Sequence, residues 1–228
     1  MKALNFENKS ITSRHIADHG VVAFSATNCK FVNCHFEKFN AREVCFGAGI
    51  GPTQYIDCTF SDVTIASNAP GRAIFKLCRF ENVRFVKLFC TEIIFIDCSF
   101  NGTFEKGSLV GELLVNEDYT DYLSSKTIGN DFSQFNIKDV SFHEFNFHHQ
   151  KFSNNDKQRI ISNLSRFISS AREKINSIES VSLCDEAYRV LKILELKNED
   201  GNNQAFLNPT NFPKALQPAA ELLLSFNN

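Results

Sequence analysis

The sequence contains no tryptophan and a single methionine, although 24 of its 228 residues are phenylalanine. Tyrosine is also rare, with four copies. This bias indicates that many positions require the same apolar shape. A repeated structural unit creates that requirement, whereas an ordinary α/β enzyme does not.

The sequence also lacks a charge excess and a long apolar run. Its formal net charge is -2, from 24 basic and 26 acidic residues, which argues against direct nucleic-acid binding. No stretch approaches the roughly 18 apolar residues of a transmembrane helix, so no membrane span is expected. The N-terminal residues MKALNFENKS lack the apolar run of a signal peptide. These absences predict a soluble cytoplasmic protein.

The eight cysteines show no metal-type spacing. They form no C-x-x-C pair and no zinc-type grouping with histidine, and a disulfide framework is not expected in a cytoplasmic chain of this size. We therefore expect no metal or other cofactor.

The cysteines instead mark a repeat. Three segments twenty residues apart read aromatic-x-x-Cys-x-Phe, and they are YIDCTF (55–60), FKLCRF (75–80) and FIDCSF (95–100). Every fifth residue from 60 to 100 is apolar or proline. Neither a helix nor a strand keeps this phase over forty residues, but a chain that turns a corner every five residues does.

Four five-residue sides make a square coil of twenty residues. Stacking such coils at the strand spacing of about 4.8 Å places residues i and i+20 above one another. Cys58, Cys78 and Cys98 are then expected to be buried, reduced and stacked in one line. The fold class predicted is mainly β, a parallel quadrilateral β-helix.

Four segments resemble the Cys/Phe variety of the pentapeptide-repeat family, whose motif is A/C/S/V, D/N, L/F, x, x. They are CHFEK (34–38), CTFSD (58–62), CRFEN (78–82) and CSFNG (98–102). The second motif position, usually Asp or Asn, is His, Thr, Arg or Ser here. The resemblance implies a right-handed β-helix (solenoid) over residues 1–153. We expect a one-residue register slip near 47–55 and an acidic insertion at about 103–130.

Residues 154–228 form a predicted α-helical region, because the apolar period changes to a helical one. One face of the first helix carries Ile161, Leu164, Ile168, Ala171, Ile175 and Ile178. Two interpretations stay open for it. The helices cap the open end of the β-helix, or Ile161, Leu164, Ile168, Ile175 and Ile178 form a homodimer seam.

Apolar side chains also occupy positions that point out of the coil. The candidate partner-binding residues among them are Ile74, Phe89, Ile94 and Ile96. A solvated solenoid face is not expected to be apolar. Either the insertion or the C-terminal helices cover this patch, or a protein partner binds it.

The insertion is rich in acidic residues. Within it, Glu117, Asp118, Tyr119, Asp121 and Tyr122 are a second candidate partner-binding segment, which suits a basic partner or forms a solvated loop.

No catalytic grouping is recognised. We expect His35, His143, His148 and His149 to face solvent. Cys184 is expected to be a packed helix residue, and the glycines of GAGIG (47–51) lack the spacing of a phosphate loop.

These features predict a non-enzymatic protein-binding scaffold that sequesters or regulates a protein partner, of a bacterial toxin-neutralising or effector type. The alternative is imitation of duplex DNA, by which quinolone-resistance members of the family protect the type II topoisomerase DNA gyrase. Duplex DNA carries about one charge per 1.7 Å, whereas residues 27–100 carry eight basic and seven acidic residues. Partner binding is therefore the preferred hypothesis.

Overall fold

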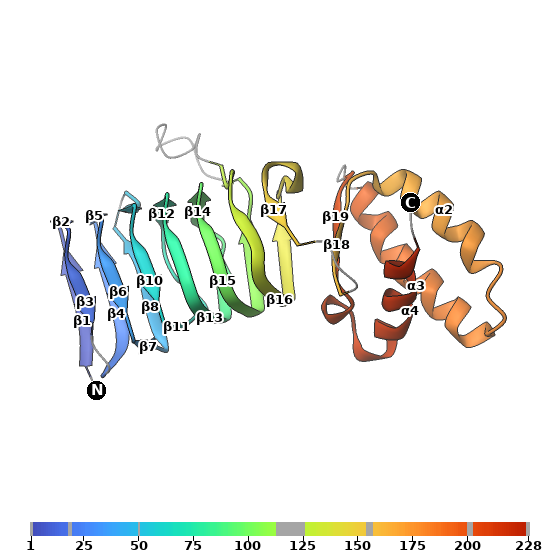
Figure 1. Ribbon diagram of the computed structural model, residues 1–228, viewed down its shortest axis with the longest axis horizontal. Helices are drawn as coiled ribbons and strands as arrows, with labels where there is room; N and C mark the ends of the chain where they lie inside the picture. The colour runs from blue at the N-terminus through green and yellow to red at the C-terminus, as the bar shows by residue number, and fades with distance from the viewer. Residues whose placement is uncertain are drawn as a thin grey trace. The chain divides into compact units, whose positions relative to one another are not determined.

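The computed structural model describes residues 2–17, 20–49, 51–112, 126–153, 157–199 and 203–226. The chain forms two compact units, Met1–Lys151 and Phe152–Asn228. The first is a parallel β-solenoid of about seven turns, and the second contains the α-helices (Figure 1). The expected mainly β solenoid is confirmed. The sequence placed the division slightly later, between residues 153 and 154.

Each coil of the solenoid has four faces, which we number in chain order, and strands of one face pair in parallel from coil to coil. Face 1 contains β1 (Lys2–Glu7), β4 (Val21–Thr27) and β8 (Glu43–Ala48). Face 2 contains β2 (Ser10–Thr12), β5 (Lys30–Val32), β9 (Thr53–Ile56), β12 (Ala73–Lys76) and β14 (Ile93–Ile96). Face 3 begins with β3 (His15–Ala17), β6 (His35–Glu37) and β10 (Thr59–Ser61), and face 4 with β7 (Asn40–Ala41) and β11 (Thr64–Ser67).

Three longer strands turn the corners without interruption and continue faces 3, 4 and 1. They are β13 (Arg79–Cys90), β15 (Ser99–Val110) and β16 (Asp131–His143), and β17 (Lys151–Phe152) pairs with the last of them. A short 3-10 helix, η1 (Phe147–His149), precedes β17.

The corners explain how the chain turns every five residues. The residue two positions after a central inward residue adopts a left-handed backbone, as at Asp57, Asp62, Asn82 and Asp97, with φ between 51° and 54°. Asn and Asp tolerate this conformation better than other non-glycine residues. The polar residues between the apolar pairs therefore set the corners.

The interior contains columns of stacked aromatic side chains and a column of cysteines. Phe36, Phe60, Phe80, Phe100 and Phe132 stack with ring centroids 4.6 to 5.1 Å apart. A second column contains Phe31, Tyr55, Phe75 and Phe95. Cys58, Cys78 and Cys98 are buried free thiols whose side chains contact one another along the stack, as predicted.

The loop near residues 47–55 is longer than expected. Phe31 pairs with Tyr55 and Phe36 with Phe60, so the coil contains 24 residues and the loop inserts four residues rather than deleting one. Gly47 allows this corner, since an added Cβ would lie 1.6 Å from the carbonyl oxygen of Arg72.

The expected start of the insertion at 103 is wrong, because β15 stays paired with β13 as far as Leu109. The repeat phase lapses earlier because the pairing shifts by one residue at Gly102, which pairs with Val83. Gly102 has φ 129°, and its Cβ would meet the Val83 carbonyl oxygen at 2.0 Å. A glycine there lets the coil close with one residue fewer.

The C-terminal unit has its own core. It contains β18 (Arg159–Ile161), α2 (Leu164–Ile175), α3 (Val181–Glu199), β19 (Ala205–Leu207) and α4 (Gln217–Ser225), with 3-10 turns η2 (Pro209–Asn211) and η3 (Lys214–Leu216). The first helix begins after Asn163, whose side chain accepts a hydrogen bond from the Arg166 amide, so Ile161 lies on a strand and not on the predicted helix. Among the helices described, none is long and apolar enough to cross a membrane.

Candidate partner-binding surface

Face 2 carries an apolar stripe on its outward side. We define the apolar stripe as Val32, Ile56, Ile74, Ile94, Ile96 and Ile128. The strand register places these side chains in neighbouring coils, with Val32 beside Ile56 and Ile74 beside Ile94. Ile96 bridges to Ile128. Val32, Ile56, Ile74 and Ile96 are half-buried, and Ile128 is 39% exposed.

The structure itself covers one end of the stripe. Ile94 is fully buried and packs with Val110, the last residue of β15, while Ile74 and Ile96 pack against this pair. The Thr127 amide donates to the Gly111 carbonyl, and its hydroxyl donates to the Val110 carbonyl at 2.8 Å. The edge of the insertion therefore covers Ile94, in line with the expectation that the chain itself covers part of this patch. The other members of the stripe remain partly accessible.

Sequence reasoning missed Val32 and Ile56. Both follow a central inward residue directly. Ile56 lies two regular coils before Ile96, whereas the 24-residue coil hides that Val32 shares this column. Lys76 lies in the same column, paired with Ile56 on one side and Ile96 on the other.

Phe89 lies apart from this stripe. It is 39% exposed and belongs to the face 1 section of β13, where it pairs with Ser108. The candidate residues from the sequence thus fall on two faces and do not form one patch.

The acidic segment of the insertion, with Glu117, Asp118, Tyr119, Asp121 and Tyr122, lies outside the described residues. The described acidic residues on either side of it pair with cations. Glu105 bonds to Arg84 at 3.2 Å, Glu112 to Lys126 at 2.9 Å, and Asp131 to Lys151 at 2.7 Å.

No acidic column runs continuously along the described part of the solenoid. On face 3, the register stacks His15, His35, Thr59, Arg79, Ser99 and Asp131 in one column. The adjacent Glu81 and Asp57 lie within 4.0 Å of the Arg79 guanidinium. This face therefore mixes charges of both signs with neutral residues.

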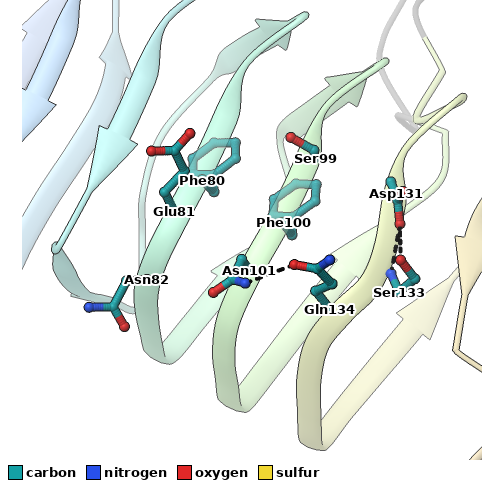
Figure 2. Close-up of a pocket in the computed structure, with 9 residues that line it drawn as sticks. All are labelled: Phe80, Glu81, Asn82, Ser99, Phe100, Asn101, Asp131, Ser133 and Gln134. Atoms are coloured by element: carbon teal, nitrogen blue, oxygen red, sulfur yellow. Dashed lines mark hydrogen bonds between the residues drawn. The ribbon is translucent and has the colours of Figure 1, made fainter.

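A shallow polar groove lies on face 3 (Figure 2). Its polar lining includes Glu81, Asn101, Asp131, Ser133 and Gln134. Asn101 donates to Gln134 at 2.9 Å, and Ser133 donates to Asp131, which also accepts from Lys151. Burial raises the pKa of Asp131, but these donors outweigh it and hold the pKa below its usual range. The groove thus offers hydrogen-bonding groups, and the Asp131 carboxylate in it already accepts from the Ser133 amide, the Ser133 hydroxyl and the Lys151 ammonium.

The expected dimer seam is occupied by the chain itself. Ile161, Leu164, Ile168 and Ile175 are buried in a core with α3, β19 and α4, and Ile178 packs against it. A homodimer through this seam would require those side chains to leave the core.

The histidines differ in their surroundings. His143 lies 3.1 Å from the Ser141 hydroxyl, while His148 and His149 lie on η1 and are exposed. Cys184 is half-buried on α3, with its thiol near the Ile175 carbonyl. Of the four histidines singled out from the sequence, only His35 belongs to a group of described residues that could hold a metal ion. The other two members of that group are His15 and Glu37. The signal for His15 was its spacing of one coil from His35.

No family model matches the chain, and no curated protein matches it. Two solved structures match, both of QnrB1, a plasmid-mediated fluoroquinolone resistance protein. The full-length structure is 15% identical, has a TM-score of 0.21, and covers 66% of this chain and 82% of that chain. The trypsin-treated form is 11% identical with a TM-score of 0.16, over 65% and 79%. The chain's own strand register, aromatic columns and left-handed corners show the solenoid of stacked coils.

Proposed function

We propose that this pentapeptide-repeat solenoid is a non-enzymatic scaffold that binds a protein partner through the apolar stripe of face 2. The observation that carries the proposal is the run of aliphatic side chains over successive coils on the outside of the solenoid, half-buried at Val32, Ile56 and Ile74. Outward positions on a solvated solenoid are normally polar, and solenoids use such extended surfaces for binding.

The acidic segment 113–125 joins the chain at Glu112 and Lys126, close in sequence to Val110, which packs on the stripe, and to Ile128, which ends it. We propose that Glu117, Asp118, Tyr119, Asp121 and Tyr122 add polar contacts to the same interface. Aliphatic contacts with an acidic margin suit a partner that presents an apolar patch with basic residues around it.

Imitation of duplex DNA, with protection of a type II topoisomerase such as DNA gyrase, is the less supported function. A DNA mimic presents dense negative charge along its length. The described columns of face 3 instead mix Arg79, neutral residues and Asp131.

The test is capture of partners from a lysate of the source cells, identification by mass spectrometry, and measurement of affinity with the purified partner. The perturbing variant combines Ile56→Lys with Ile74→Lys. The fold should accept lysine at these outward positions, because Lys76 already occupies the column of Ile56. The matched control is Thr64→Lys on face 4, which is also half-buried.

We expect the double variant to bind at least about 30-fold more weakly, because it places unpaired charges in a desolvated interface. Thr64→Lys should keep wild-type affinity. Equal affinities for all three proteins contradict the stripe as the interface. Protection of purified gyrase from a quinolone in a supercoiling assay supports the alternative function.

A further inference from the structure

Two histidines lie one above the other on the outside of face 3. His15 on β3 pairs with His35 on β6, one coil later. Their rings stack with centroids 4.9 Å apart and planes inclined by 19°. This spacing is the distance between coils, so the twenty-residue register alone holds both imidazoles on the same side.

Glu37 completes the group. It lies two residues after His35 on β6, and a strand places residues i and i+2 on the same side. Its Oε2 lies 2.7 Å from His15 Nε2. The ligand atoms of His15, His35 and Glu37 all lie within 4.8 Å of one another.

The surroundings hold these side chains in place. His35 Nε2 lies 2.7 Å from the Ser61 hydroxyl of the next coil, and the Lys38 ammonium contacts the other carboxylate oxygen of Glu37. The Glu37 side chain is only 16% exposed. The Lys38 ammonium and His15 both contact this carboxylate, one at each oxygen. Lys38 leaves Oε2 directed at His15.

We propose that His15, His35 and Glu37 bind one divalent transition-metal ion, for which Zn²⁺ is best suited. Two imidazole nitrogens and one carboxylate oxygen are a ligand set of zinc sites that keep a water in the fourth position. Binding replaces the hydrogen bond between His15 and Glu37 with two metal bonds. The ion also links the first coil to the second, whose side chains are much more buried than those of β1, β2 and β3.

The test is calorimetric titration of the untagged, metal-free full chain with zinc chloride. We expect saturable binding of one ion per chain. His15→Ala and Glu37→Gln should each weaken the affinity about tenfold or more, because each removes a ligand. The matched control joins His148→Ala with His149→Ala, which removes an exposed histidine pair elsewhere in the solenoid and should keep the affinity.

Two further measurements identify the site. Zinc should raise the unfolding temperature of the wild type and not that of Glu37→Gln. Glutamine has nearly the same shape as glutamate, and circular dichroism in the presence of EDTA checks that this variant folds. Cobalt substitution should give d–d absorption bands without a thiolate charge-transfer band. The proposal is overturned if the wild type shows no saturable binding, if the ligand variants bind as well as the wild type, or if the cobalt spectrum shows thiolate ligation.

Discussion

Phe80 and Phe100 stack with their rings parallel to within 1° and their centroids 4.7 Å apart, although twenty residues separate them. Phe80 also stacks on Phe60 in the preceding coil, at 5.1 Å. The Phe80 ring therefore packs against the coil before it and the coil after it. Removing one ring leaves a gap at two interfaces between coils.

Phe80→Ala should lower the free energy of unfolding by about 3–5 kcal/mol, because it creates a cavity in a packed interior. Urea denaturation followed by circular dichroism measures the loss. The matched control is Phe89→Ala, nine residues away on the same strand and 39% exposed, for which a loss within about 1 kcal/mol is expected. Similar losses for both variants contradict the stacked-column interpretation.

The buried thiols should resist alkylation. Burial raises the pKa of Cys78, and the side-chain hydrogen bond with Cys78, followed by burial, raises that of Cys58. A thiol reacts as its thiolate, so both should stay unmodified in the native chain. Timed treatment with a maleimide and mass spectrometry should show modification of half-buried Cys45 and Cys184 first. Early labelling of Cys78 in the folded protein is the contrary result.

Leu77→Asn should stabilise the solenoid. Leu77 has φ 56° at a corner where the neighbouring coils have Asp57 and Asp97, and it is 48% exposed. Asn relieves a left-handed strain of about 1 kcal/mol at little loss of buried area. The thermal midpoint should therefore rise. Leu77→Ala keeps the strain and should give no such rise, so a gain shared by both variants would assign the effect to the loss of an exposed leucine instead.

Acid should weaken the ion pair between Asp131 and Lys151. The pKa of Asp131 is lower in the folded chain than its ordinary value, so its stabilising effect is complete above the unfolded value of about 3.9 and is lost as pH falls through the folded value. Between about pH 5 and pH 2, the denaturation midpoint of the wild type should fall more steeply than that of Asp131→Asn. Asp97→Asn, at a corner of an earlier coil, should retain the wild-type slope. A parallel decline of wild type and Asp131→Asn would contradict this role.

Ile175→Ala tests whether the α2 face has an intramolecular role. Ile175 is fully buried in the C-terminal unit, so truncation should cost about 2–5 kcal/mol of its stability. Sedimentation equilibrium should give the same molar mass for the variant and the wild type. A halved mass for the variant would instead support the homodimer seam.

The sequence by itself determined the solenoid, its period and its interior columns. Cys58, Cys78 and Cys98 recur one coil apart, and the requirement for an apolar residue at each inward position is local and repeats many times. The corners could also be read locally, since Asp57 and Asp97 suit the left-handed backbone found there.

In a repeat of five residues, loops whose lengths differ by five residues give the same sequence phase. The distance from Phe46 to Phe60 therefore fits a deletion of one residue or an insertion of four, and only the pairing of Phe36 with Phe60 decided between them. The same limit placed the start of the insertion too early, because a single shortened corner at Gly102 shifts the phase without ending the coil.

Tertiary structure alone decided which outward residues remain accessible and which meet. Ile94 and Ile74 look alike in the sequence, yet Ile94 is fully buried in a cluster with Val110 whereas Ile74 is only half-buried. His15 and His35 are one coil apart in the sequence, but their contact with Glu37 depends on side-chain geometry across two coils. Burial restricts inward positions to apolar residues, and the sequence pattern shows this restriction. The contacts of outward residues depend on tertiary neighbours, which the sequence pattern does not specify.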